Sequence, residues 1–304
     1  MSTRELDAAG ITDPATRASY GRCRELNAQH GKTYYLATRL LPPAKRPYVH
    51  ALYGFARYAD EIVDDLASTL SPQEKSDWLG WWGEQVLVDL DKGESSDPIG
   101  RAVVDTVQRW EIPTEHFEAF LHSMRMDLTV TEYPTYDDLY TYVYGSAAVI
   151  GLQMVPILEP LDDGVYEPAK DLGVAFQLAN FIRDVSEDLD RGRVYLPTED
   201  LERFGLTRQH LETRQVTPAV RDLLAFEVAR VRRLSHQADA GIPLLHPTSR
   251  PCIEAAQELY VGIVDEVEAI DYQVFDVRAT TSPWRRARVA GAAYGRALRA
   301  RWSS

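Results

Sequence analysis

Oxygen-bearing side chains recur at one-turn intervals in the stretch from Gln177 to Pro197. Asn180, Asp184 and Asp188 stand four residues apart, so a helix would align them in one column beside Gln177. Carboxylates at this spacing destabilise a helix by roughly 0.2–0.5 kcal/mol per pair, and a bound cation would remove that cost. Because the ligands are all oxygens, the column favours a hard ion, Mg²⁺ or Mn²⁺, over zinc. The simpler alternative is a solvated acidic helix face, since two more acidic residues stand nearby.

A second acidic column lies far from the first in the sequence. Its members share one strip about 60° wide on a helix; they are Tyr53, Arg57, Asp60 and Asp64. Apolar residues flank both columns, which places each column at the margin of a buried helix face. Glu61 and Asp65 point further toward solvent, so we interpret them as ordinary surface charge.

Two such columns facing each other across a helical cavity would bind several Mg²⁺ ions, and such a cluster suits a diphosphate group. The metals and nearby cations would neutralise the charge that develops on a departing diphosphate. Arg57 and Arg183 stand beside one column each, and arginine has the shape for bidentate phosphate contacts. Lys32 with Thr33 offers a further cation and hydroxyl. One such arginine alone would be read as a surface residue, whereas two beside two columns favour a site.

Departure of a diphosphate leaves a carbocation, which needs an apolar pocket that excludes water. Aromatic faces stabilise cations, and the candidates are Tyr34, Tyr53, Tyr142 and Tyr260. The small, apolar run Gly145–Gly151 indicates a close approach, either of another helix or of a ligand in a long apolar cavity. The sequence contains no serine-hydrolase elbow, P-loop, zinc-protease or dinucleotide-binding motif.

The composition is typical of a globular protein, with 45% hydrophobic and 26% charged residues among 304. The net charge of −13 argues against a nucleic-acid partner and against adhesion to anionic lipid through overall charge, while leaving room for a local basic patch. Two cysteines cannot build a disulfide framework or a thiolate metal site, and they favour a reducing compartment. No signal peptide or membrane-spanning stretch is recognisable. We therefore expect a cytoplasmic protein, with a peripheral contact at the inner membrane surface as a further option.

Helical periodicity runs through almost the whole chain and predicts one all-α domain over residues 1–304, with 1–12 and 303–304 as candidates for disorder. The two columns belong to helices expected over residues 44–66 and about 167–193. A short helix should end before Pro42, and another should start at the Ser71-Pro72 cap. The remaining expected helices span residues 14–29, 99–110, 114–130, 136–158, 217–240, 249–275 and 282–302.

Two further features concern the surface. Trp78, Trp81 and Trp82 follow the Ser71-Pro72 cap, and we expect them to be packing residues. The last expected helix, residues 282–302, is rich in arginine. Its simplest interpretation is a solvated amphipathic helix, and contact with a membrane surface is the sharper alternative.

Four segments together resemble the squalene/phytoene synthase family in order and spacing. The resemblance extends over about residues 20–278, and the segments are KTYYLATRLLP (32–42), ALYGFARYADEIVDD (51–65), YVYGSAAVIG (142–151) and QLANFIRDVSEDLDRGRVYLP (177–197). The form D-x-x-E-D-x-x-R-G-R-x-Y-L-P is most similar to that of bacterial phytoene synthases, of an actinobacterial type. The two acidic motifs are highly specific in combination.

The resemblance implies an isoprenoid synthase fold, a helical bundle around one central cavity, and the head-to-head condensation of two prenyl diphosphates. One diphosphate ionises, and the allyl cation attacks the double bond of the other molecule to give a cyclopropylcarbinyl diphosphate. That intermediate ionises in turn and rearranges to a linear product. Mg²⁺, with Mn²⁺ as a substitute, is the implied cofactor. The sequence has no nicotinamide signature, which favours phytoene over squalene, whose formation in this family requires a reductant.

The resemblance also implies roles for single residues. Metal or diphosphate positions are matched by Asp60, Asp64, Asn180, Asp184 and Asp188. The four aspartates among them are also expected to act in catalysis. Substrate-contacting positions are matched by His30, Lys32, Thr33, Tyr34, Tyr53, Arg57, Gln177, Arg183, Tyr195, Tyr260 and Arg278. Tyr142 matches a catalytic tyrosine that assists deprotonation or the second ionisation. Two positions depart from the family: Gly31 replaces a common serine in the first diphosphate-binding turn, and the C-terminal arginine falls by register on Val277, so we assign it to Arg278.

The expected substrate is geranylgeranyl diphosphate, and the expected product is phytoene, in carotenoid biosynthesis. Thr38 is small where relatives that make shorter products often carry phenylalanine, and Gly145–Gly151 adds small residues. One alternative is a squalene or dehydrosqualene synthase that uses farnesyl diphosphate. Others are a class I terpene cyclase and a non-catalytic helical relative that serves as a binding partner. The sequence does not indicate an oligomeric state.

Overall fold

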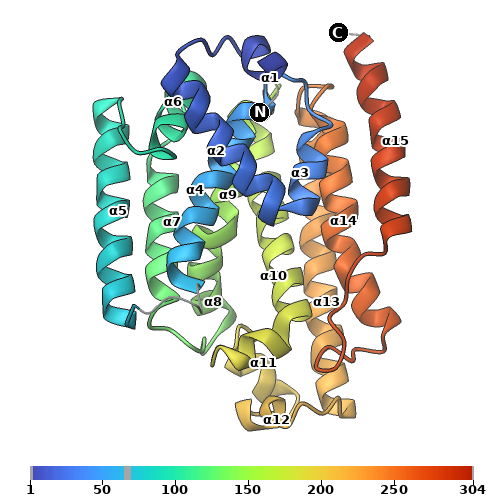
Figure 1. Ribbon diagram of the computed structural model, residues 1–304. Helices are drawn as coiled ribbons and strands as arrows, with labels where there is room; N and C mark the ends of the chain where they lie inside the picture. The colour runs from blue at the N-terminus through green and yellow to red at the C-terminus, as the bar shows by residue number, and fades with distance from the viewer. Residues whose placement is uncertain (1–2, 65–69, 303–304) are drawn as a thin grey trace.

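A 25-residue helix, α10 (Tyr166–Asp190), lies at the centre of the molecule (Figure 1). It begins with Pro168 in its first turn, and it buries a stripe that includes Leu178, Ile182 and Val185, as the periodicity predicts. The helices packed against it are α9 (Val149–Ile157), α13 (Pro218–Ala238) and α14 (Arg250–Ala269). The acidic column of α10 therefore stands at the margin of a helix that the rest of the bundle surrounds.

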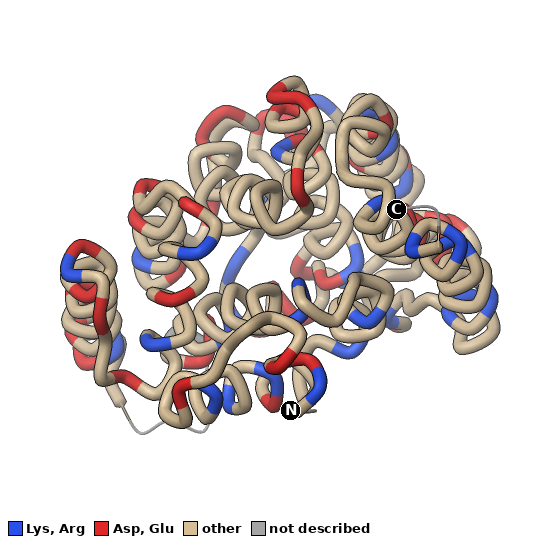
Figure 2. Tube along the Cα trace, turned by 90° about the horizontal axis from the view of Figure 1, so that it is seen from above, with Lys and Arg blue, Asp and Glu red and all other residues tan. Residues whose placement is uncertain are grey.

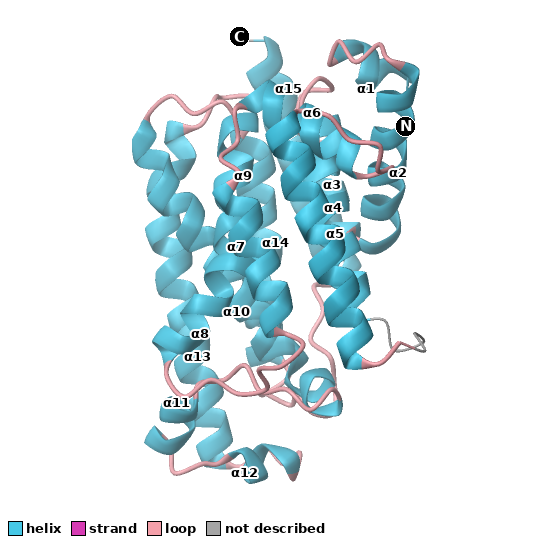
Figure 3. Cartoon of the chain, turned by 90° about the vertical axis from the view of Figure 1, so that its left-hand side faces the viewer, coloured by secondary structure: helices cyan, strands magenta, loops and turns pink. Residues whose placement is uncertain are grey.

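The computed structural model describes residues 3–64 and 70–302, and these form helices joined by loops (Figure 3). The all-α class predicted from the sequence is confirmed. The elements before α9 are α1 (Thr3–Ala8), α2 (Pro14–His30), α3 (Lys32–Thr38), α4 (Arg46–Asp64), α5 (Pro72–Lys92), α6 (Gly100–Trp110), α7 (Glu115–Met126), α8 (Tyr136–Val143) and the π-helical turn η1 (Tyr144–Ala148). The others are η2 (Asp163–Val165), α11 (Thr198–Arg203), α12 (Arg208–Glu212), η3 (Asp239–Leu244) and α15 (Pro283–Trp302).

Local sequence sets several helix ends. The Asp13 carboxylate accepts a hydrogen bond from the Thr16 backbone N–H at 2.7 Å, which caps α2 where the sequence predicts its start. Ser71 and Glu74 form a reciprocal capping box at the start of α5. After α10, Gly192 adopts a φ of 75°, a left-handed conformation that ends helices.

Some boundaries differ from expectation. Residues Thr3–Ala8 form α1, inside the segment for which the sequence favours disorder. The helix expected over 136–158 is divided by η1, and α11 and α12 were not expected. The helix expected to reach residue 275 ends at Ala269, because Asp271 and Tyr272 adopt φ values of 52° and 60°. The end of the helix expected over 44–66 lies outside the described residues.

The three tryptophans of α5 have different environments. Trp82 is buried at 3% exposure, so its expected packing role is confirmed. Trp78 and Trp81 are 45% and 55% exposed and contact each other with ring centroids 5.2 Å apart, so the expectation is wrong for these two. The helix lies at one edge of the molecule, where only one of its faces meets the core (Figure 1).

Two glycine contacts bring α10 close to the elements before it. A Cβ on Gly173 would lie 2.5 Å from the Ala147 carbonyl oxygen, and one on Gly151 would lie 2.3 Å from that of Ala169. The close approach that the small residues predict is thus confirmed. Charged positions lie mostly around the periphery of this bundle (Figure 2).

Both cysteines, Cys23 and Cys252, are buried and free, in agreement with the expectation that they build no disulfide framework. Among the described residues, no helix is both long and apolar enough to pass through a bilayer.

Candidate active site

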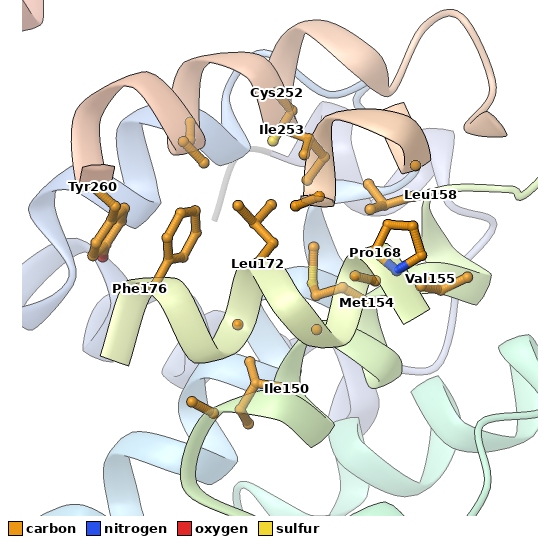
Figure 4. A pocket seen from close by; sticks show the side chains of 18 of the residues that line it. Ile150, Met154, Val155, Leu158, Pro168, Leu172, Phe176, Cys252, Ile253 and Tyr260 are labelled. Atoms are coloured by element: carbon orange, nitrogen blue, oxygen red, sulfur yellow. The ribbon is translucent and has the colours of Figure 1, made fainter. Parts of the chain in front are cut away.

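An apolar cavity of about 200 Å³ lies between α3, α9, α10 and α14. Figure 4 shows the side chains of α10 and α14 pointing toward one another across it, with Leu172 and Phe176 opposite Ile253 and Tyr260. Thr38, Ser146 and several other small residues also line it, as the sequence leads us to expect for a long apolar wall. Gly151 belongs to this wall, whereas a Cβ on Gly145 would meet the Ala119 carbonyl oxygen of α7 at 2.1 Å. Gly145 therefore allows close helix packing, whereas Gly151 lines the cavity. Each of the two alternatives for the small-residue run thus applies to part of it.

One end of the cavity is polar, because Gln177 and Asn180 of α10 line it there. The Asn180 Oδ1 atom is buried and has no hydrogen-bond partner within the protein. An orphaned amide oxygen at this depth is costly unless a ligand supplies a partner. The arrangement therefore fits a site at which a cation or a hydrogen-bond donor is bound.

Aromatic rings connect the two columns. Tyr34 of α3 lies 6.0 Å from Tyr53 of α4 and 6.2 Å from Tyr260 of α14, measured between ring centroids. Tyr260 in turn stacks on Phe176 of α10 at 4.6 Å. Burial raises the pKa of Tyr260 to about 12 and that of Tyr34 well above its ordinary value, so both rings are neutral at physiological pH. Sequence reasoning missed Phe176, because a single phenylalanine on a helix carries no signal that separates a cavity residue from a core residue.

The column on α10 is held by two arginines. The Asp184 carboxylate, 17% exposed, accepts hydrogen bonds from both Arg183 and Arg278, the latter at 2.9 Å. Arg278 also contacts Glu187 at 2.8 Å. Burial alone would lower the pKa of Arg183, but the hydrogen bond and charge of Asp184 raise it. The neighbouring Val277 is 50% exposed, so the geometry favours Arg278 as the C-terminal arginine of the site.

The column on α4 pairs in the same way. Arg57 donates to Asp60 at 2.6 Å and to Glu61 at 3.3 Å, and Glu61 lies 3.5 Å from the His30 ring nitrogen. Glu61, whose side chain is 36% exposed, thus connects α4 to the turn that precedes α3. The side chain of Asp64, the last residue of α4, lies outside the described residues, as does Asp65.

The turn at the start of α3 explains one departure from the family. A Cβ on Gly31 would lie 2.6 Å from the Tyr53 ring, so the ring occupies the space that a serine side chain would need. Lys32 is exposed and Thr33 is partly buried.

The expected Mg²⁺ site can be tested against the donors present. Asn180, Asp184 and Asp60 offer oxygens only, and the orphaned Asn180 oxygen is in place for a ligand, so the donor set fits a hard cation. Within residues 3–64 and 70–302, no three Asp, Glu, His or Cys side chains are close enough to hold a metal by themselves. A complete coordination shell would therefore need other oxygens, such as those of a diphosphate or water.

Two of the predicted residues that do not line the cavity share a hydrogen-bond partner. Tyr142 and Tyr195 are buried and donate to the two oxygens of the Asp127 carboxylate at 2.7 and 2.8 Å. Burial, followed by the charge of Asp127, raises the pKa of Tyr142 well above its ordinary value. Asp188 lines a smaller space beside Tyr195. Asp127 stands outside both columns, and no pattern in the sequence marks it.

Solved structures with the same architecture are isoprenoid-type synthases. A dehydrosqualene synthase in complex with a ligand matches with a TM-score of 0.83 and 27% identity, over 92% of this chain and 96% of that one. A squalene synthase from Alicyclobacillus acidocaldarius matches with a TM-score of 0.79 and 27% identity, over 87% of this chain and 98% of that one. The expected isoprenoid synthase fold is confirmed.

The particular family follows from the sequence match. The model of the squalene/phytoene synthase family matches residues 27–285, and the chain belongs to this family of prenyltransferases. A phytoene synthase of Arthrospira platensis is 37% identical, over 90% of this chain and 92% of the relative. A 15-cis-phytoene synthase of Synechocystis sp. is 38% identical, over 86% and 80%. A chloroplastic phytoene synthase of Narcissus pseudonarcissus is 38% identical, over 92% and 67%.

Proposed function

We propose that the chain, acting as one all-α domain, condenses two molecules of geranylgeranyl diphosphate to phytoene in a Mg²⁺-dependent reaction of carotenoid biosynthesis. The observation that carries this proposal is the apolar cavity that starts at Gln177 and Asn180 and extends along α10. Relatives called phytoene synthases support the C20 substrate. The similar solved structures are described as dehydrosqualene and squalene synthases, which keeps farnesyl diphosphate as the alternative substrate.

The length of the cavity favours the longer substrate. Its lining on α10 runs from Asn180 to Pro168, which is twelve residues and about 18 Å of helix. An extended chain advances about 1.2 Å per bond, judging from about 3.5 Å per three-bond residue, so a geranylgeranyl chain measures about 19 Å and a farnesyl chain about 14 Å. The C20 chain would fill the lining, and the C15 chain would leave its deep end empty.

The diphosphate groups would bind at the polar end. Arg57, Arg183 and Arg278 already reach carboxylates there, and Lys32 is exposed at the neighbouring turn. These cations would hold and orient the diphosphate oxygens. Asn180, with Asp60, Asp184, Asp64 and Asp188, would hold the metal. When bound, Mg²⁺ would neutralise negative charge on the diphosphate and make it a better leaving group.

The allyl cation left by diphosphate departure would face neutral aromatic rings. Tyr34, Phe176 and Tyr260 line the cavity next to its polar end. Their π-faces stabilise a nearby cation, and the apolar wall beyond them excludes water that would quench it. The double bond of the second molecule would then attack this cation, and loss of a proton would close the ring of the cyclopropylcarbinyl diphosphate. Departure of its diphosphate, rearrangement and loss of a second proton would lead to phytoene.

Tyr142 is proposed to act on the second step together with Asp127, to which its hydroxyl donates. Replacing Tyr142 with Phe removes that hydroxyl and leaves the buried ring. We expect the variant to consume the first substrate but to accumulate the cyclopropyl intermediate, measured by extraction after phosphatase treatment. Loss of both steps in equal proportion would contradict this role.

The test of the proposed function is a product assay of the purified chain. It supplies Mg²⁺ with geranylgeranyl or farnesyl diphosphate in parallel, each with and without NADPH, and adds EDTA as the metal-free control. Phytoene from the C20 substrate without NADPH is the expected result. A C30 product alone would overturn the C20 assignment, a cyclic product would place the chain among terpene cyclases, and no diphosphate release from folded protein would indicate a non-catalytic relative.

A further inference from the structure

The outward face of α15 is aromatic. The helix lies on the outer edge of the molecule and packs against α14, burying Val289, Ala293 and Ala297 (Figure 1). Trp284 and Trp302 on the opposite side are each 84% exposed. They stand eighteen residues apart, which is five full turns, so they share one line on the helix surface about 27 Å long. An isolated exposed tryptophan needs no explanation, but two aligned on one face mark an interaction surface.

The surface between the two tryptophans is open and adds a third aromatic residue. Tyr294 is 53% exposed. A Cβ added to Gly291 or Gly295 would meet nothing within 4 Å, so no other segment within residues 3–64 and 70–302 covers this line. The face therefore has room for a flat partner along its whole length.

The charge of α15 is opposite to that of the chain. The helix has six arginines and no acidic residue, whereas the net charge of the chain is −13. The inward arginines are paired with α14: Arg285 contacts Asp265 at 2.7 Å, and Arg296 contacts Glu254 at 2.8 Å. On the outward side, Arg288 is 73% exposed and lies 3.7 Å from Glu258 of α14, and Arg299 is exposed as well. The outward face thus combines tryptophan, tyrosine and arginine.

The catalytic site does not account for this face. No residue of α15 lines the cavity. The match to the family model ends at residue 285, so nearly all of α15 lies beyond that match. In a symmetric dimer through this face, the α15 helices of the two copies would contact each other. Both helices carry arginines and no carboxylate, so the charges would repel. A surface of anionic lipid headgroups has the complementary charge.

We propose that the outward face of α15 lies flat on an anionic bilayer surface, with Trp284 and Trp302 at the headgroup level and Arg288 and Arg299 near the lipid phosphates. Tryptophan and arginine are the residues that interfacial helices place at these positions. The purpose of the contact rests on the proposed function, since an apolar C40 product must leave for a bilayer. The binding itself requires no turnover.

The test is sedimentation of the purified full-length chain with vesicles, without substrate. The chain should bind vesicles of phosphatidylglycerol and phosphatidylcholine, bind pure phosphatidylcholine vesicles more weakly, and dissociate as salt is raised. R288Q/R299Q should weaken binding about 25-fold, because each arginine near an anionic surface contributes about 1 kcal/mol, or about fivefold. W284S/W302S should lose most of the binding.

The matched control is W78S/W81S. It removes two exposed tryptophans from α5, which lies at the opposite edge of the molecule and carries five acidic and two basic residues (Figure 1). This variant should bind vesicles like the unchanged chain. If W284S/W302S also bound unchanged, or if it converted a dimer into a monomer in sedimentation velocity, the membrane proposal would be overturned. Turnover in detergent is a separate readout, so the failure of one proposal leaves the other measurable.

Discussion

Ala169→Phe should separate the two possible substrates. Ala169 lines the cavity and stands eleven residues before Asn180, about 16 Å along α10. A farnesyl chain of about 14 Å would end before this point, and a geranylgeranyl chain of about 19 Å would pass it. The phenylalanine ring would therefore overlap the last isoprene unit of the C20 chain and leave the C15 chain untouched.

The size of the effect follows from the cost of overpacking. Forcing extra carbon atoms into a packed apolar site typically costs about 1–3 kcal/mol, which corresponds to about a fivefold to 150-fold loss in kcat/KM. The loss should appear with geranylgeranyl diphosphate and not with farnesyl diphosphate. The ratio of the two kcat/KM values, measured by product extraction, is the readout.

Ala169→Ser is the matched control, because it changes volume little and should leave the substrate ratio unchanged. A cooperative thermal melt of the phenylalanine variant establishes that it is folded. If that folded variant used geranylgeranyl diphosphate with unchanged kcat/KM, the C20 chain would not extend along α10 as far as Ala169. The argument from cavity length would then be refuted.

Three further predictions concern charge and packing. Arg278→Gln should lower kcat/KM about tenfold, since a charged contact at this half-exposed position contributes about 1.5 kcal/mol, whereas Val277→Ala should leave steady-state kinetics unchanged. Gly31→Ser should lower the melting temperature by about a few degrees, because its Cβ would meet the Tyr53 ring at 2.6 Å. Burial raises the pKa of Glu227 from 4.5 to about 7, so the stability it provides is present below pH 4.5 and is lost as pH rises through about 7. Glu227→Gln should therefore gain stability relative to the unchanged chain as pH rises from 5 to 7.5, measured by thermal melts.

Each of these predictions has an outcome that contradicts it. Equal losses in the Arg278 and Val277 variants would mean that the loop, not the guanidinium, matters. An unchanged melting temperature for Gly31→Ser would mean that Tyr53 moves freely. Asp200 still pairs with Arg230 at 2.8 Å in the Glu227 variant, so a stability difference independent of pH would show that Glu227 does not titrate in this range.

The sequence predicts what helical geometry determines locally. Asn180, Asp184 and Asp188 fall on one column because their spacing matches the helical repeat, and α10 extends through all three. The same reasoning fails beyond the end of a helix. Counting along a helix places the C-terminal arginine at Val277, but α14 ends at Ala269 and the register is lost in the turn that follows.

Contacts between segments that are far apart in the sequence produce no periodic pattern in it. Tyr142 and Tyr195 share the carboxylate of Asp127, which stands 15 residues from one and 68 from the other. Helical periodicity does not identify Asp127 as the shared partner, and it does not predict that Asp127 lies outside the lining of the cavity. Both facts depend on how α7, α8 and the segment after α10 pack. Glu61 is a different case: its i,i+4 spacing from Arg57 was readable, yet the helical angle alone suggested solvent.

Gly31 shows how a departure from a family pattern becomes a physical constraint once the neighbours are known. In the sequence it is a missing hydroxyl in the first diphosphate-binding turn. In the structure the Tyr53 ring occupies the space above it, and Tyr53 also contacts Tyr34 at the aromatic wall. The glycine therefore lets a ring of the α4 column approach the turn and join the wall. Hydroxyl contacts to a diphosphate at this turn would then have to come from Thr33, and under the proposed function the Tyr53 ring beside it would face the carbocation that diphosphate departure leaves.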